Sequence, residues 1–281
     1  MTRVGMLGFV IGAAVTTLPA CAPARRLAGS AHAAAPLTIG ETFTVESSTL
    51  GETRRINVYL PPAYADTARL PVLYMPDGGM AEDFLHVAGL VQVSVGNGTM
   101  RPFILVGIEN TARRRDLTGP TQRAEDRAIA PAVGGSAAFR RFIRSELMPA
   151  VRARYRTTDE SAIVGESLAG LFVVETYFLE PDLFDTYIAF DPSLWWNGGD
   201  LVERAGARIG AGAGRSLYLA SSSEGRIAAL TARLADALAG GAPAGTAWHY
   251  EPMPAESHAT IYHPAALLAF RRLFRPAPAP E

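Results

Sequence analysis

The stretch SAIVGESLAGLFVVETYFLE, residues 161–180, places one serine between two apolar runs with almost no polar residue beside it. We expect Ala162–Gly165 to form a strand and Leu168–Leu179 to form a helix, which puts Ser167 on the turn between them. A sharp, strained turn from strand to helix brings its backbone ends close together, so it needs small residues on both sides. A glycine and an alanine stand two positions before and after the serine. This pattern is typical of a nucleophile elbow.

The five-residue pattern G-x-S-x-G is nevertheless loose. Here Ala169 takes the place of its last glycine, and Gly170 follows one position later. A chain with 27 glycines contains such matches by chance, and the same residues fit an ordinary turn between a strand and a helix. The rest of the sequence is therefore needed to distinguish a nucleophile elbow from an ordinary turn.

Length and composition indicate a globular protein with a sizeable core. The chain has 281 residues, of which 48% are hydrophobic, and its formal net charge is -1. Because it has neither a basic surplus nor a nucleic-acid-binding motif, we expect no nucleic acid partner. All 26 basic residues are arginine, which excludes Schiff-base chemistry, pyridoxal phosphate attachment and phosphate binding through a Walker-type lysine. We expect neither a metal nor a cofactor, and the oligomeric state is left open.

Residues 1–35 are expected to be an export leader and a flexible linker. Arg3 supplies a positive charge, Val4–Leu18 is apolar but short for a transmembrane span, and the only cysteine, Cys21, follows it. The residues around this cysteine resemble a bacterial lipobox, from which Pro19 departs, and a cut after Ala33 is the alternative. We therefore expect an exported protein, periplasmic or anchored to a bacterial membrane by lipid on Cys21. A single cysteine forms no intrachain disulfide.

Residues 36–275 contain no linker or repeat long enough to divide them, so we expect one domain, followed by a loose tail, 276–281. Thr42–Glu46 and Arg54–Leu60 alternate polar and apolar residues, as an antiparallel pair of strands would. Continuous apolar runs then recur with helical segments between them, at Pro71–Met75, Phe103–Ile108, Ala162–Val164, Thr186–Phe190, Ser216–Ala220 and, more weakly, Thr246–Tyr250. This order predicts an α/β fold with a mostly parallel sheet, an antiparallel N-terminal pair, and helices on both faces.

Helical spacing is clear between residues 139 and 154. Apolar side chains recur there every three or four residues, at Phe139, Phe142, Ile143, Leu147 and Val151. The arginines between them are expected on a solvated helix face; they are Arg140, Arg141, Arg144, Arg152 and Arg154. The same reasoning predicts helices over 227–238 and 264–274.

The position of Ser167 at the carboxyl end of a parallel strand is where open α/β sheets bind their ligands. A serine hydroxyl is a weak nucleophile without a base, and in this type of fold the base follows it in the chain. His258 lies in a loop after the last predicted strand and is the expected base. The other four histidines are better explained elsewhere: His32 in the leader, His86 before the serine, His249 within a strand, and His263 at the start of the final helix.

The sequence offers three candidates for the carboxylate that would orient this base. Glu224 follows the strand Ser216–Ala220 and stands between the serine and the histidine, in the expected order of serine, acid and histidine. Asp191, after the preceding strand, is the rival, and Glu256 is so near His258 that it could shape that loop instead. Position alone favours Glu224.

Five stretches of the chain, in order along nearly the whole domain, carry a family resemblance. They are LYMPDGG (73–79), VGIENTARRRDLT (106–118), VGESLAGLF (164–172), DPSLWW (191–196) and ESHATIYHPA (256–265). Together they resemble the esterase family of α/β-hydrolases that includes esterase D and the enterobactin-type siderophore esterases, most closely its bacterial predicted-hydrolase branch. Ala169 and Asp191 depart from the commoner glycine and serine. The resemblance implies an α/β-hydrolase fold and hydrolysis of a small-molecule ester, a siderophore lactone included.

The expected chemistry follows from these residues. His258 takes the proton of Ser167 as the hydroxyl attacks an ester carbonyl, and water later discharges the acyl-enzyme by the same route. The amide of Leu168 is one expected donor to the oxyanion, and an amide of the turn that holds Gly79 and Met80 is the other.

Two groups of residues are candidates for substrate binding. Trp195 and Trp196 follow a predicted strand and could wall the pocket, although burial is the commoner use of tryptophan. Asn110 and the arginines that end with Arg115 lie in the loop after another strand, where one arginine could pair with an anionic substrate. A solvated loop is the alternative explanation for these arginines.

Two other functions use the same fold. A lipid-anchored ligand-binding module would need no chemistry, and the presence of both Ser167 and His258 argues against it. Acyl transfer to an alcohol would use every residue named above, so the sequence does not separate it from hydrolysis.

Overall fold

The computed structural model describes residues 35–65, 67–243 and 245–277. The chain divides into two compact units, Met1–Thr38 and Ile39–Glu281, and every helix and strand described below belongs to the second. The predicted lipidation site, Cys21, and the predicted cleavage sites lie outside the described residues. Among the helices of the described part, none is long and apolar enough to cross a membrane.

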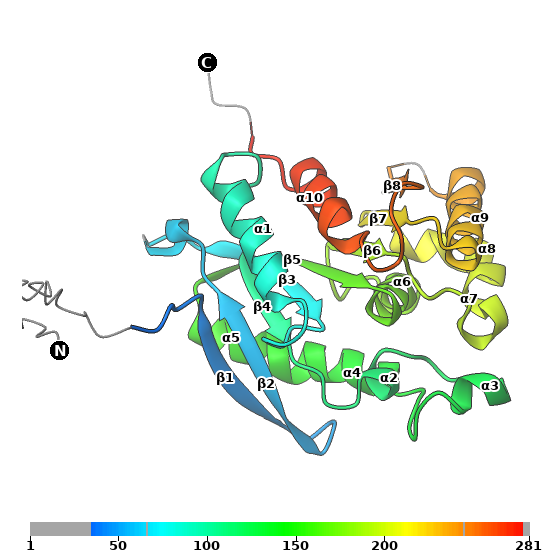
Figure 1. The fold of residues 1–281 in the computed structure, drawn as a ribbon, viewed down its shortest axis with the longest axis horizontal. Helices are drawn as coiled ribbons and strands as arrows, with labels where there is room; N and C mark the ends of the chain where they lie inside the picture. The colour runs from blue at the N-terminus through cyan, green and yellow to red at the C-terminus, as the bar shows by residue number, and fades with distance from the viewer. Residues whose placement is uncertain (1–34, 66, 244, 278–281) are drawn as a thin grey trace, which may run out of the picture. The chain divides into compact units, whose positions relative to one another are not determined.

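One eight-stranded sheet forms the centre of the second unit (Figure 1). Its spatial order is β1-β2-β4-β3-β5-β6-β7-β8. The strands are β1 (Glu41–Ser47), β2 (Glu52–Tyr59), β3 (Leu70–Pro76), β4 (Ile104–Ile108), β5 (Thr157–Glu166), β6 (Thr186–Phe190), β7 (Ser216–Ser221) and β8 (Ala247–Pro252). β2 is antiparallel to both β1 and β4, and all other neighbours are parallel. The predicted α/β-hydrolase fold, with its antiparallel N-terminal pair, is therefore confirmed.

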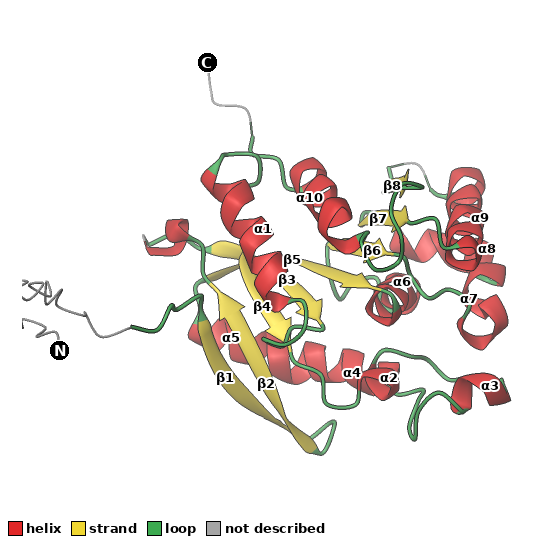
Figure 2. Cartoon of the chain, viewed as in Figure 1, coloured by secondary structure: helices red, strands yellow, loops and turns green. Residues whose placement is uncertain are grey.

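Helices cover both faces of the sheet (Figure 2). The helices of four or more residues are α1 (Phe84–Gly96), α2 (Arg113–Asp116), α3 (Ala124–Arg127), α4 (Ser136–Phe142), α5 (Met148–Arg154), α6 (Leu168–Leu179), α7 (Asp200–Glu203), α8 (Ala205–Arg208), α9 (Gly225–Gly241) and α10 (Tyr262–Leu273). A π-helical turn, Ile143–Leu147, joins α4 to α5, and 3-10 turns occupy Pro62–Ala65, Trp196–Gly199 and Ile209–Gly212.

Alternate residues of the parallel strands enter two separate cores, because successive side chains of a strand point to opposite faces. Val72, Tyr74 and Ile163 pack with α4, α5, α6 and α9 on one face. Leu73, Met75 and Val164 pack with α1 and α10 on the other. Because both faces of these strands are buried, they appear in the sequence as continuous apolar runs.

Arg140 corrects one expectation about the helical segment between residues 139 and 154. Its side chain is only 4% exposed, although it was predicted to face solvent. Its guanidinium donates to Glu175 and Glu180 of the neighbouring α6 region. The apolar spacing correctly predicted a helical segment. It could not show that Arg140 is buried, because an ion pair with another segment does not alter the pattern of apolar residues.

Candidate active site

Three adjacent strands of the sheet each end in a polar residue with a strained backbone. Asp77 follows β3, Ser167 follows β5 and Asp191 follows β6, and their φ angles are 56°, 59° and 41°. Side chains other than glycine rarely adopt positive φ, and such strain collects at active sites. Because parallel strands end at the same edge, this strain lies at one edge of the sheet, where α/β folds bind ligands.

The turn at Ser167 has the form of a nucleophile elbow. α6 begins directly after it at Leu168, as predicted. A side chain on Gly165 would come within 2.7 Å of Ala169, and one on Gly170 within 2.9 Å of the carbonyl oxygen of Phe190. The elbow therefore tolerates alanine at position 169 and needs glycine at positions 165 and 170, which explains the departure from G-x-S-x-G.

Backbone hydrogen bonds to the neighbouring strand hold the elbow in place. The Ser167 amide donates to the carbonyl oxygen of Phe190 at 3.0 Å, and the Ser193 amide donates to the carbonyl oxygen of Ser167, also at 3.0 Å. The Ser193 hydroxyl lies 3.4 Å from the Ser167 hydroxyl. Sequence reasoning missed Ser193, although it belongs to the DPSLWW stretch that carried the resemblance.

His258 reaches Ser167 from the loop before α10. Its Nε2 atom lies 3.1 Å from the Ser167 Oγ, within hydrogen-bond distance. Its Nδ1 atom lies 2.9 Å from Oδ2 of Asp191, on the opposite side of the ring. A proton on Nδ1 would leave Nε2 free to accept the serine proton.

The acid that contacts His258 is Asp191, where sequence position had favoured Glu224. Asp191 is fully buried. Glu224 is exposed just before α9 and lines the cleft, and its amide, not its carboxylate, bonds to Ser222. Both acids follow a parallel strand, so their order in the chain could not separate them; the left-handed turn at Asp191 aims its side chain at the histidine.

Ser222 stabilises the ionised form of Asp191. Its amide donates to Oδ1 at 2.5 Å and its hydroxyl donates to Oδ2 at 2.6 Å. Although burial favours the neutral acid, the hydrogen bonds from His258 and Ser222 lower the pKa of Asp191 below its usual value. The hydrogen bond to Asp191 in turn raises the pKa of His258, against the effect of partial burial, and the nearby charge of Glu166 adds to this rise. Sequence reasoning missed Ser222, which stands in the serine run before Glu224.

A second carboxylate, that of Glu166, also faces His258. Its Oε1 atom lies 3.3 Å from His258 Nδ1. Burial raises the pKa of Glu166 to about 7, although the charges of His258 and Arg113 oppose the rise. One ligand atom each from Glu166, Asp191 and His258 lie within 4.8 Å of one another, the spacing that a metal ion would need. A metal on Nδ1 would, however, take the place of the proton that ties His258 to Asp191.

The predicted oxyanion donors differ in their availability. Leu168 opens α6, where the first amides have no partner within the helix, so its amide is available beside Ser167. The Gly79 amide donates to Oε2 of Glu82 at 2.7 Å and is therefore occupied. Within the described residues the Met80 amide makes no hydrogen bond, which leaves it as the available donor of that turn.

A cleft of about 410 Å³ opens over Ser167 and His258. Trp195 lines it together with Ser193, Glu224, Arg226 and Ile227. Trp196 does not: it is 4% exposed, and its indole donates to the carbonyl oxygen of Gly119 at 2.9 Å. Of the two tryptophans expected to wall the pocket, the structure brings only Trp195 to it.

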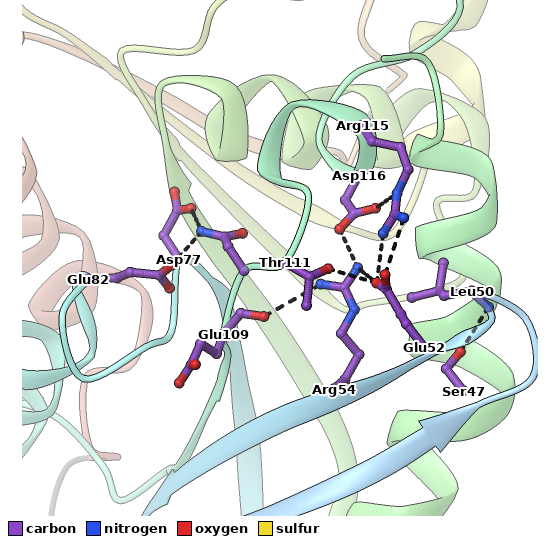
Figure 3. Close-up of polar contacts among 11 residues, drawn as sticks. Ser47, Leu50, Glu52, Arg54, Asp77, Glu82, Glu109, Thr111, Arg115 and Asp116 are labelled. Carbon is purple, nitrogen blue, oxygen red and sulfur yellow. Dashed lines mark hydrogen bonds and ion pairs between the residues drawn. The ribbon is translucent and has the colours of Figure 1, made fainter. Parts of the chain in front are cut away.

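Asn110 and Arg115 do not line this cleft, and both bond to other side chains of the protein. Figure 3 shows Arg115 beside Glu52 and Asp116. Asn110 donates to Asp77 and to Glu82. Arg115 pairs with Glu52 and Asp116, each at 2.7 Å. These contacts tie the segment after β4 to β2 and β3. Neither residue lines the cleft over Ser167, and their role in substrate binding stays a prediction.

Arg113 lies closer to the site. It donates two hydrogen bonds, at 2.7 and 2.8 Å, to the two carboxylate oxygens of Asp77. This bidentate pair accounts for the buried charge of Asp77 at the end of β3. Arg114, between the other two arginines, is exposed.

Comparison with known proteins agrees with this geometry. The family model described as "Putative esterase" matches residues 47–239. The chain belongs to this family. A solved IroE-like serine hydrolase from Shewanella oneidensis is 30% identical, with a TM-score of 0.75 over 84% of this chain and 80% of that one. The siderophore hydrolase EstB from Aspergillus nidulans, 23% identical with a TM-score of 0.74 over 89% of this chain and 99% of that one, shares the fold.

Two curated relatives match a smaller part of this chain than the solved structures do. The ferri-bacillibactin esterase of Bacillus subtilis is 31% identical over 182 residues, which is 57% of this chain and 61% of the relative. The siderophore triacetylfusarinine C esterase of Aspergillus fumigatus is 33% identical over 195 residues, 62% of each chain. The matches thus span about three fifths of the length of these relatives.

Proposed function

We propose that this protein is a serine-dependent carboxylic ester hydrolase that works through an acyl-enzyme. The observation that carries the proposal is the line of contacts from Ser167 through His258 to Asp191, at 3.1 and 2.9 Å. Nucleophile, base and orienting acid lie in the order that acyl transfer requires, and the nucleophile stands on a strained elbow beside a helix N-terminus.

In this mechanism, Ser167 Oγ attacks the ester carbonyl carbon while His258 Nε2 takes the hydroxyl proton. Asp191 holds the ring through Nδ1 and stabilises the imidazolium that forms. The Leu168 amide, with that of Met80, donates to the oxyanion. The imidazolium then protonates the leaving alcohol. A water molecule, deprotonated by His258, releases the acid from Ser167.

Esters of the siderophore class are the proposed substrates. Of the two curated relatives above, one is named a siderophore esterase and the other a ferri-bacillibactin esterase. The cleft over Ser167 is open, and it offers an aromatic wall at Trp195 and a cation at Arg226. An aromatic side chain can pack against a flat part of an ester, and a guanidinium can pair with an anionic group on it.

Neither alternative function accounts as well for the site. A binding module would not need the strained φ of Ser167, which costs stability, or a histidine and an aspartate aligned behind it. Acyl transfer differs only in the acceptor that discharges the acyl-enzyme. Both curated relatives are named as esterases, which favours hydrolysis.

We also propose that the protein is exported and anchored by lipid on Cys21. The support is the order of a charged, an apolar and a small-residue segment ending at the only cysteine of the chain.

The proposed activity is tested by turnover of a panel of aryl and acyl esters together with a siderophore trilactone, and by labelling with a fluorophosphonate probe. We expect hydrolysis of at least one ester and covalent labelling at Ser167. A folded protein that neither turns over the panel nor reacts with the probe would favour the binding module. Product formation that depends on an added alcohol acceptor would favour acyl transfer.

A further inference from the structure

Glu166, the last residue of β5, is a buried carboxylate that the mechanism above does not use. Its side chain is 15% exposed and stands directly before the nucleophile in the chain. Its Oε1 atom is fully buried, and within the described residues it has no hydrogen-bond partner. A buried acceptor without a donor is costly, so such an atom is expected to have a reason for its position.

The group that Oε1 faces is the side of His258 turned away from the serine. The distance to Nδ1 is 3.3 Å, only slightly longer than the 2.9 Å from Nδ1 to Asp191. Two carboxylates of different character therefore contact one ring nitrogen. Ser222 donates to both carboxylate oxygens of Asp191, whereas Oε1 of Glu166 receives no hydrogen bond from any residue that the structure describes.

We propose that Glu166 is a second positioning residue for His258, which shares the Nδ1 side of the ring with Asp191 and supplies part of the countercharge when the imidazolium forms. This inference rests on the proposed function. As Ser167 gives its proton to Nε2, the ring gains a positive charge 3.3 Å from Oε1. Opposite charges this close attract strongly in a partly buried site, so an ionised Glu166 lowers the energy of that state.

The charge of Glu166 depends on pH near neutrality, because burial raises its pKa to about 7. The charged groups that act on it are His258, Arg113, Asp191 and Asp83, from four different segments. Below this pKa Glu166 is mainly neutral and gives His258 no countercharge. Above it Glu166 is anionic, which raises the pKa of His258 and stabilises the imidazolium.

The sharpest test compares the pH profile of kcat/KM for the wild type and Glu166→Gln, a substitution that keeps the shape and removes the charge. Loss of the charge lowers the pKa of His258, so the acidic side of the profile should move to lower pH. The plateau at high pH should fall by about tenfold, the effect of one charge-assisted contact. Glu166→Asp keeps the charge and should stay closer to the wild type. Glu160→Gln, on the same strand and paired with Arg101, is the matched control and should change neither feature.

A merely structural role for Glu166 would lower activity equally at all pH values. A Glu166→Gln profile that superimposes on the wild type, or that falls without shifting, would therefore overturn the proposal.

A double-variant series tests the sharing of Nδ1. If Glu166 also holds the ring, Asp191→Asn alone should lose about 10²-fold in kcat, and adding Glu166→Gln should bring the loss to the 10⁴-fold typical of a missing triad acid. Equal rates for the single Asp191→Asn and the double variant would contradict this part of the inference.

An NMR titration of His258 gives a readout that needs no turnover. Its ring resonance is assigned by its loss in His258→Ala, and its midpoint should move to lower pH in Glu166→Gln. An unchanged midpoint would refute the inference. If the midpoint shifts but the protein hydrolyses no ester, the proposed function would be refuted. The pairing of Glu166 with His258 would still be supported.

Discussion

Ser222 holds both carboxylate oxygens of Asp191, one through its amide at 2.5 Å and one through its hydroxyl at 2.6 Å. Removing the hydroxyl in Ser222→Ala should raise the pKa of Asp191 and weaken its hold on His258. A hydrogen bond to a charged group contributes about 1.5–3 kcal/mol, so we expect a loss of roughly tenfold or more in kcat/KM. Steady-state kinetics at neutral pH check this. Ser223→Ala, which removes an exposed hydroxyl bonded to the Glu256 carbonyl, is the control and should be nearly silent.

The pair Ser167 and His258 should act as one unit. Ser167→Ala and His258→Ala are each expected to lose about 10⁴-fold or more in kcat, and the double variant should lose little further, because neither group works without the other. Fluorophosphonate labelling of Ser167 should also require His258. A Ser167→Ala variant that keeps its esterase activity would exclude the elbow serine as nucleophile.

Asp191 and Glu224 should differ sharply when each is replaced by alanine. Asp191 contacts Nδ1 of His258, so Asp191→Ala should reduce kcat by about 10²-fold or more. Glu224 is exposed at the cleft and acts on the ring only through its charge, so Glu224→Ala should change kcat by less than about tenfold. The measurement is kcat for both variants, compared as the ratio of the two losses. The reverse ranking would mean that the acid lies after β7, as the sequence had suggested.

The residues of this site show which parts of it could be predicted from the sequence. The strand and helix around Ser167 were predictable because apolar periodicity is local, and α6 begins and ends where predicted. His258 was found by exclusion, since only its loop placement fitted a base. Asp191 could not be preferred over Glu224 from the sequence, because both follow parallel strands. Asp191 reaches His258 because of the positive φ at its own position and its hydrogen bonds to Ser222, 31 residues away.

The arginines illustrate a second limit. Arg113 and Arg115 were predicted to meet substrate or solvent, but each has a partner far away in the chain, Asp77 after β3 and Glu52 in β2. An ion pair between distant segments leaves no periodic mark in the sequence. A substrate role was therefore as plausible as a structural one until the partners were known.

The anchor prediction concerns Cys21, which lies outside the described residues. Cys21→Ala in the full chain should release the protein from the membrane fraction or stall its processing, because no other cysteine can carry the lipid. Fractionation followed by mass spectrometry of the mature N-terminus measures both. Unchanged membrane association together with cleavage after Ala33 would count against the lipoprotein assignment.

Arg54 provides a stability prediction for the network beside the site (Figure 3). Its side chain is fully buried and pairs with Asp116, itself 1% exposed, and with Glu52. Arg54→Met removes one of the two cations that pair with the buried Asp116 and leaves Arg115 as the other. The cost should therefore approach, but not exceed, that of a buried carboxylate left without any partner, about 3–5 kcal/mol. We therefore expect a clearly lower midpoint in urea unfolding. Arg204→Met, which breaks an exposed pair between the residue after α7 and Asp200, four positions earlier, is the control. Exposed pairs at this spacing contribute about 0.3–0.5 kcal/mol. Equal midpoints for the two variants would show that Arg115 alone compensates the charge of Asp116. Arg54 would then not be needed to hold the segment that contains Arg113.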